Sequence, residues 1–355
     1  MLGDPTVILD PVDWNRAAAP ELGRTPILDW IECTCLLRSN CGNNEPINLR
    51  NMITIWEEAG LSLNPPSTRT SVANTAISGI EDDSNEDDDS NDSNDLQSDH
   101  VELLLEQFRD RSSILGSAYP FELSKDTATI RCIHNDFHTA LYAHLLLLCA
   151  IEGYGRKNPF SNVTDKEHYT LRLFFESIVL HCLRNFGYDC AQIGTGAGSS
   201  NFFNRLQHTL QSLNLGIPNP RTKVRPGIKD GGADILAGHF WGDRRSREVV
   251  HIIQCTVSPP QKWSIKINEA AATHWYGLLN QECPGVPCLA TPYETTDDAR
   301  HEFSSWLMQT HSFIDRIRLT LAAQQLNLTK IPDYATYISI IKKALTATCR
   351  SKDIT

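Results

Sequence analysis

Two short apolar stretches, each with a polar residue in its interior, constrain the fold of this chain most. Lys229–Gly238 reads KDGGADILAG, and Val249–Ser258 reads VVHIIQCTVS. Both resemble β-strands, and the glycine pair before the first strand permits a tight turn. A carboxylate or an amide inside an apolar strand costs free energy unless it has a partner. The sequence therefore predicts a hairpin in which Asp234 and Gln254 belong to a site.

Helical and strand patterns alternate through the second half of the chain. Apolar spacing predicts helices over 166–189 and 201–216, and apolar runs predict strands over 233–240, 248–257 and 285–294. Alternation of this kind is typical of an α/β or α+β core.

The chain is long enough for more than one structural unit. Its 355 residues, of which 41% are hydrophobic, can form a large core and two or three units. We divide it into a mainly helical N-terminal region (1–78), an acidic linker (79–100), a helical segment (101–165), the α/β core (166–300) and C-terminal helices (301–355).

The linker is expected to be disordered. Glu81–Asp95 reads EDDSNEDDDSNDSND and holds nine acids, no base and no apolar period. A segment of this composition has nothing to bury. Because this run supplies most of the net charge of −11, the rest of the chain is close to neutral. The overall acidity therefore does not exclude a local basic surface that binds nucleic acid.

The cysteine spacing and the short apolar runs indicate a protein of the reducing cytoplasm. The eleven cysteines follow no spacing of a disulfide framework, so we expect free thiols in a reducing, cytoplasmic protein. Cys33, Cys35 and Cys41 lack a nearby fourth zinc ligand, which favours ordinary thiols. The longest apolar run, Ala140–Ile151, is too short to cross a membrane. Nothing at the N-terminus is typical of a signal peptide.

Three polar residues in apolar surroundings form the candidate catalytic and metal-binding set. Glu176 lies in the apolar helix segment LFFESIVL, and Asp234 and Gln254 lie in the two strands. Mg²⁺ is a hard cation that takes oxygen ligands. A metal held by such ligands activates water and stabilises charge on a phosphate. We predict that Asp234, Gln254 and Glu176 bind Mg²⁺ or Mn²⁺.

Each member of this set also has a structural interpretation. Asp234 could cap the turn before its strand, and Gln254 could satisfy neighbouring backbone groups. Glu176 could lie on a solvent-facing stripe of its helix.

The order of these segments resembles a known family. FFESIVLHCLRNFGYD, KDGGADILA and VVHIIQCT resemble the helix–strand–strand core of the PD-(D/E)xK nuclease superfamily, and most closely its Mrr-type restriction endonucleases. That group combines a helix acid, D-G-G-x-D and Q-x-K. The resemblance covers about 166–300. It implies a restriction-endonuclease-like core with a mixed four-stranded sheet, Mg²⁺-dependent DNA endonuclease activity, and roles in bacterial restriction or anti-phage defence. By analogy, it also implies an ATPase or another operon-encoded partner.

The sequence departs from this pattern at the lysine. Thr256 stands where Q-x-K has lysine, and threonine carries no charge. Lys266, on a helix expected to begin near Trp263, is the preferred replacement, and Lys262 is the second choice. Lys266 could equally be an ordinary surface lysine. If nothing replaces the lost lysine, the chain is a catalytically inactive nuclease-fold subunit that binds DNA or scaffolds a complex.

Two basic segments flank the first predicted strand. RTKVRPGIK precedes the strand and GDRRSR follows it. Together they could form a positive surface for phosphates, although exposed basic turns are common. The predicted nucleic-acid-binding residues are Arg221, Lys223, Arg225, Lys229, Arg244 and Arg245. The sequence does not distinguish DNA from RNA, and it permits a homo-oligomer.

A glycine-rich loop lies between two of the predicted elements. Ile193–Ser200 reads IGTGAGSS and precedes a predicted helix. It lacks the lysine of a P-loop, so a nucleotide site is not expected. In a nuclease the loop would lie beside the active site, where its amides could touch a DNA backbone.

Overall fold

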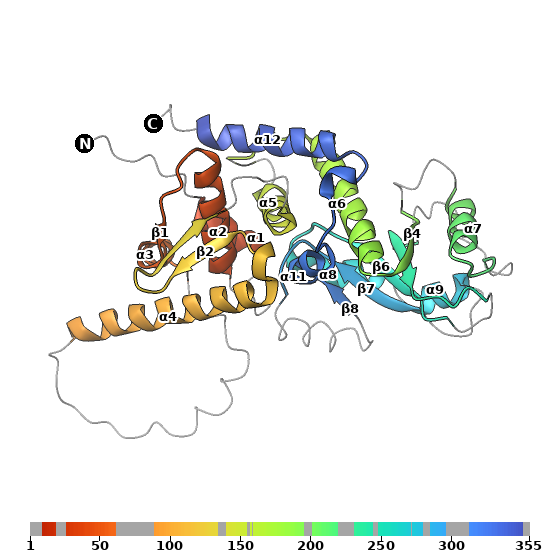
Figure 1. The fold of residues 1–355 in the computed structure, drawn as a ribbon, viewed down its shortest axis with the longest axis horizontal. Helices are drawn as coiled ribbons and strands as arrows, with labels where there is room; N and C mark the ends of the chain where they lie inside the picture. Colours follow the sequence, from red (N-terminus) through yellow and green to blue (C-terminus); the bar gives the residue numbers. More distant parts are fainter. Residues whose placement is uncertain are drawn as a thin grey trace, which may run out of the picture.

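A computed structural model describes most of the chain. The described residues are 9–18, 26–61, 89–133, 140–154, 157, 159–194, 201–218, 231–243, 248–270, 272–279, 285–295 and 312–350. They form an elongated body with a helical part at one end and a larger sheet at the other (Figure 1).

The first part is helical, with a small sheet. Its helices are α1 (Pro11–Ala18), α2 (Pro26–Asn40), α3 (Leu49–Glu58), α4 (Asp89–Leu115), the short η2 (Gly116–Ala118) and α5 (Leu141–Tyr154). Its strands β1 (Ile47–Asn48), β2 (Phe121–Ser124) and β3 (Thr129–Cys132) pair antiparallel in the order β1-β3-β2. Because α5 is apolar on nearly every side, it is buried along most of its length and forms the centre of this part.

The second part is built on a five-stranded sheet. The strands are β4 (Asp189–Gln192), β5 (Ile235–Gly238), β6 (His251–Cys255), β7 (Val286–Ala290) and β8 (Ser312–Ile314). The helices are α6 (Asp165–Asn185), α7 (Phe202–Ser212), η4 (Pro260–Lys262), α8 (Trp263–Glu269), α9 (Ala272–Leu278), α11 (Arg316–Ala322), η5 (Leu328–Lys330) and α12 (Tyr334–Arg350).

The sheet is mixed, in the order β4-β5-β6-β7-β8. The pairs β4–β5 and β5–β6 are antiparallel, and the pairs β6–β7 and β7–β8 are parallel. A parallel pair needs a crossover connection, and α8 and α9 lie within the one from β6 to β7. Both faces are covered, since α6 packs with Ile235 and Ile253, while α7 and α9 pack with Leu236 and Ile252.

Local signals explain the placement of α6, the helix that carries Glu176. Thr164 and Glu167 form a capping box at its start. The helix ends at Asn185, and Gly187 follows with a φ of 95°, a conformation that glycine adopts without steric cost. The predicted helix over 166–189 is thus confirmed, apart from its last residues.

The predicted α/β class is confirmed, with differences in detail. The sheet has a fifth strand, β8, within the region 301–355 that we expected to be helical. Strand β8 has only three residues, too few to show the alternation of apolar and polar residues that marks a strand in a sequence. It is defined by its pairing with β7, in which Ser312 lies opposite Cys288. Residues 1–165 contain a small sheet as well as the expected helices.

The acidic linker is shorter than expected. Helix α4 begins at Asp89, so residues 89–100 are helical and not part of a disordered linker. Residues 79–88, the rest of the expected linker, lie outside the described part of the chain.

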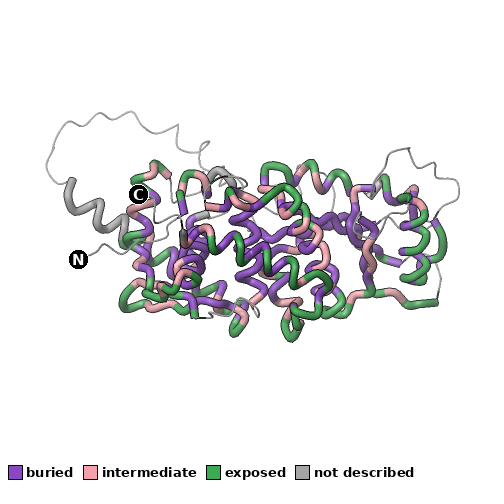
Figure 2. The backbone as a smooth tube through the Cα atoms, turned by 90° about the horizontal axis from the view of Figure 1, so that it is seen from above, coloured by how far each residue is buried: buried purple, intermediate pink, exposed green. Residues whose placement is uncertain are grey.

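The two parts share one hydrophobic core. A single cluster extends from Trp30 and Leu146 in the first part to Ile253 and Leu345 in the second. Figure 2 shows the buried residues running through the middle of both parts. The two parts are therefore packed together over a common apolar interior.

A buried ion cluster crosses the same interface. It consists of Asp29 and Glu32 from α2, Arg111 from α4, Glu294 after β7 and Arg316 from α11. Arg111 lies 2.9 Å from Asp29 and 2.8 Å from Glu32, and it also pairs with Glu294. Arg316 pairs with Asp29 and lies 3.6 Å from Glu294.

Two tyrosines complete this cluster, and Arg111 keeps its positive charge within it. Tyr119 and Tyr142 donate hydrogen bonds of 2.6 and 2.7 Å to the carboxylate of Glu32. Burial disfavours the charged form of Arg111, but Glu294 and Glu32 more than offset this and hold its pKa above the usual value. Arg111 therefore stays ionised inside the protein.

Removing one arginine from the ion cluster should destabilise the whole chain. Arg111→Met leaves the three carboxylates of the cluster with Arg316 as their one remaining arginine, and removing one partner from a buried ion cluster costs about 3–5 kcal/mol. Arg109→Met, at an exposed position of the same helix, should change the free energy of unfolding by less than about 0.5 kcal/mol. Denaturant unfolding of both variants measures the difference in the free energy of unfolding. Equal stabilities would contradict the proposed contribution of the ion cluster to stability.

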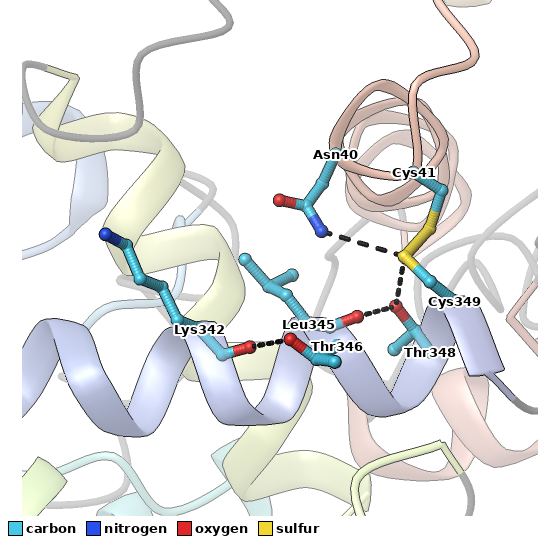
Figure 3. The surroundings of a disulfide bond; sticks show 7 residues. All are labelled: Asn40, Cys41, Lys342, Leu345, Thr346, Thr348 and Cys349. Carbon is cyan, nitrogen blue, oxygen red and sulfur yellow. Dashed lines mark hydrogen bonds between the residues drawn. A yellow bond between two sulfur atoms is a disulfide. The ribbon is translucent and has the colours of Figure 1, made fainter.

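A disulfide links the ends of α2 and α12. Cys41 and Cys349 are bonded, with 5.6 Å between their Cα atoms and a separation of 308 positions in the sequence. Asn40 lies beside Cys349 Sγ at 3.9 Å (Figure 3). The expectation of free thiols is therefore wrong for this pair, because spacing along the sequence does not reveal which distant cysteines meet. The other eight described cysteines, Cys33 and Cys35 among them, are buried and form no disulfide.

Opening this disulfide should lower stability. Cross-links that close long loops restrict the unfolded chain, and losing one costs about 2–5 kcal/mol. Cys41→Ser and the reduced wild type should therefore unfold at the same, lower denaturant concentration than the oxidised wild type. A variant as stable as the oxidised protein would show that the bond does not contribute.

In the described part of the chain, no helix combines the length and the apolar character that crossing a membrane requires.

Candidate functional site

Asp234 and Gln254 meet at one end of the β5–β6 pair, as the sequence predicted. Gln254 Nε2 donates to Asp234 Oδ2 at 2.9 Å, and the backbone N–H of Cys255 donates to the same oxygen at 2.8 Å. Both side chains are buried, at 5% and 7% exposure. The Asp234 N–H itself donates to the Ile253 carbonyl at 2.8 Å. A buried carboxylate thus receives two donors on one oxygen.

Glu176 reaches the same region from α6. Its Oε2 accepts a 2.9 Å hydrogen bond from Gln192 Nε2, at the end of β4. The side chain of Glu176 is partly buried, so it does not lie on a solvent-facing stripe of the helix. Gln192 therefore orients Glu176 in the way that Gln254 orients Asp234.

The carboxylates of Asp234 and Glu176 both lie close to Gly194. The N–H groups of Ile193 and Gly194 donate to the Asp234 carbonyl at 2.8 and 3.1 Å. A Cβ built on Gly194 would lie 2.8 Å from Asp234 Oδ1 and 3.4 Å from Glu176 Oε2. The space beside this glycine is therefore bordered by both acids, and a side chain would fill it.

Cys255 also lies near both acids. Burial, followed by the charges of Asp234, Glu176 and Cys288, raises the pKa of the Cys255 thiol well above its usual value. The thiol therefore stays protonated at neutral pH and is no nucleophile.

The turn before β5 packs tightly on α8. A Cβ on Gly232, whose φ is 75°, would lie 2.0 Å from the Glu269 carbonyl oxygen, so only glycine fits there. This contact places the end of α8 against the turn, and Lys266 lies one helical turn earlier in α8. Lys266 Nζ is bonded to Glu269 Oε2 at 2.9 Å in this arrangement.

Thr256, which stands in place of the family's lysine, forms a local hydrogen bond. Its hydroxyl accepts a hydrogen bond of 3.1 Å from the Ser258 backbone N–H. The predicted helix start near Trp263 is confirmed by α8. The role of Lys266, or of Lys262 as second choice, remains a prediction.

The six predicted nucleic-acid contacts lie outside the described residues. These are Arg221, Lys223, Arg225, Lys229, Arg244 and Arg245. Asp230 and most of the glycine-rich loop, 195–200, also lie outside them.

The donor set suits a hard cation with few protein ligands. Within the described ranges, no three His, Cys, Asp or Glu side chains converge as a metal site. Two carboxylates do border one space, and Mg²⁺ in proteins often keeps several waters and takes only one or two carboxylates. Asp234 and Glu176 are therefore the two described residues that could hold such an ion beside Gly194.

Three residues of the site were not found from the sequence. Gln192 and Cys255 carry no motif, and Gly194 is one glycine of a loop with several. Their part depends on β4 ending beside β5. The one sequence signal was the glycine-rich loop Ile193–Ser200, which contains Gly194 and was expected beside the active site of a nuclease.

Comparisons of the chain with protein-family models, curated proteins and solved structures find no match. The geometry of the described residues is therefore the basis for assigning a function.

A methyl group at Gly194 should disturb the carboxylate pair. Gly194→Ala places a Cβ in close contact with Asp234 Oδ1, which should cost about 1–3 kcal/mol of stability. Gly277→Ala in α9 is the matched control, because nothing lies within 4 Å of its Cβ and alanine favours helices by about 0.5–1 kcal/mol. Thermal unfolding should show opposite shifts, and a neutral Gly194→Ala would contradict the described packing.

Proposed function

We propose that this protein is a metal-dependent endonuclease that hydrolyses phosphodiester bonds in DNA. The observation that carries the proposal is the pair of carboxylates, Asp234 and Glu176, which border one space beside Gly194 at the end of a mixed sheet. Their order on helix and strand agrees with the resemblance to PD-(D/E)xK nucleases, whose core fold we propose for residues 166–300. Restriction or anti-phage defence is the role that this resemblance favours.

The residues at this site would have different roles: binding the metal, orienting the metal ligands and supplying positive charge. Asp234 and Glu176 would hold Mg²⁺ or Mn²⁺, which when bound activates water and stabilises charge on the phosphate. Gln254 and the Cys255 N–H fix one oxygen of Asp234 and leave the other facing Gly194. Gln192 donates to Oε2 of Glu176, the oxygen of that carboxylate that lies nearest the space beside Gly194. Lys266 would supply the positive charge that Thr256 lacks, after leaving Glu269.

A second candidate is supported by the lysine positions. Thr256 carries no charge, and Lys266 is bonded to Glu269 within its own helix. If that bond persists when substrate is bound, the site lacks a cation and the chain is a non-catalytic subunit with a nuclease fold. Such a subunit would bind DNA or scaffold a complex.

Cleavage of DNA by the full chain tests the first candidate. Wild-type protein with Mg²⁺ or Mn²⁺ should cut supercoiled and linear DNA, and Asp234→Asn should lower the rate at least about 100-fold. The amide keeps the size of the side chain and an oxygen for the Cys255 N–H, so the variant should fold. Glu102→Gln, at an exposed position of α4, is the control that removes a carboxylate elsewhere.

Further arms separate the alternatives. Lys266→Gln should lower cleavage while calorimetry still detects Mn²⁺ binding, because the lysine would not be a metal ligand. RNA substrates in parallel report the preferred nucleic acid. DNA binding in gel-shift assays without Asp234-dependent cleavage of DNA or RNA would overturn the enzyme proposal and support the non-catalytic subunit.

A further inference from the structure

A second cavity lies on the same sheet, away from the carboxylate pair. It has a volume of about 330 Å³ and lies between the end of α6, the helix α11 and the sheet. Ala237, Ile253 and Cys288 line it from three adjacent strands. This volume is within the range of small-molecule sites, about 300–1,000 Å³.

The walls of this cavity are held in place. Asn185 Nδ2, at the end of α6, donates to the carbonyls of Ala322 and Gln324 at 2.8 and 2.9 Å. The two helices that border the cavity are thereby fixed to each other where α11 ends. When a ligand binds to a preformed cavity, ordering the side chains and loops of the protein costs little free energy.

One side of the cavity is aromatic. Phe186, Tyr188 and His251 line it. The rings of Phe186 and Tyr188 are stacked at 6.2 Å, and Tyr188 meets His251 edge-on at 5.7 Å. Phe186 is 64% exposed, so the face of its ring is accessible from solvent. Flat rings at this wall suit an aromatic partner, which can stack on them.

The opposite side is polar and positively charged. Ser312 and Arg318 line it, next to the buried thiol of Cys288. Burial raises the pKa of the Cys288 thiol to about 12. A hydrogen bond with Ser312 and the charge of Arg318 lower the same pKa, so Ser312 and Arg318 both interact with this thiol beside the cavity. Arg318 uses one nitrogen for the Phe313 carbonyl, at 2.5 Å. A guanidinium has further N–H donors in a fork that matches a carboxylate.

The charge of the cavity favours an anion with a single charge. Burial and the neighbouring His239 lower the pKa of His251, so this ring is neutral at pH 7. Among the described residues that line the cavity, Arg318 is then the one cation.

We propose that this cavity binds a small aromatic carboxylate, with the carboxylate at Arg318 and Ser312 and the ring against Phe186 and Tyr188. The proposal goes beyond the endonuclease function and does not depend on it. His251 and Ile253 line the cavity on β6, and the next residue along the strand is Gln254 at the carboxylate pair. A ligand here would therefore contact the strand that orients Asp234.

Binding of 1-naphthoate to the full-length protein tests this assignment. Calorimetry should detect binding of 1-naphthoate to the wild type, with weaker binding of octanoate and of the neutral 1-naphthalenemethanol. Arg318→Gln, at an exposed position, should weaken naphthoate binding about tenfold or more, because a charge-assisted hydrogen bond is lost. Binding of the neutral alcohol should not change in this variant.

Two more variants locate the ligand. Ala322→Phe adds a ring at the cavity wall and should remove binding of all three probes. Arg50→Gln, an exposed arginine of α3, is the control with the same loss of charge and should bind naphthoate as the wild type does. Absent naphthoate binding, or binding that both cavity variants leave unchanged, would overturn the proposal. Octanoate binding as tightly as naphthoate would overturn the aromatic assignment, and an unchanged affinity in Arg318→Gln alone would overturn the carboxylate assignment.

Discussion

The register of β5 against β6 is the constraint on which the candidate site depends. Ile235 lies opposite Ile253, and Leu236 lies opposite Ile252. Both faces of this pair are buried under helices, so a slip of one residue would transfer each side chain to the wrong face. The same register brings Asp234 to the Cys255 N–H and the Gln254 amide. Hydrophobic packing thereby holds a buried carboxylate in a fixed orientation.

Alternation along β6 also separates the two proposed sites. His251 and Ile253 face the cavity beside α6, whereas the side chain of Gln254 bonds to Asp234 at the other end of the strand. Cys255 lies on the α6 side, near Glu176, where burial and the two acids keep its thiol protonated. A single strand can therefore serve a metal-binding pair and a small-molecule cavity without sharing a side chain.

The two parts of the chain are joined by interactions that span most of its length. Asp29 and Arg316 are 287 positions apart and meet in the buried ion cluster, and the disulfide joins Cys41 to Cys349. Because the ionised groups are enclosed by apolar side chains, each depends on its partners to remain buried. The first part is thus fixed against α11 and α12, and α12 in turn packs on α6, which carries Glu176 (Figure 1).

The sequence by itself determined the local elements and the main members of the candidate site. Apolar periodicity and flanking glycines predicted α6, β5 and β6, and the cost of burying polar groups singled out Asp234 and Gln254. Only the tertiary structure decided the fifth strand β8, the early start of α4, the disulfide, and the parts played by Gln192 and Gly194. Periodicity reports the environment of a residue within its own element. The identity of a partner hundreds of positions away depends on how the elements pack, which no local pattern contains.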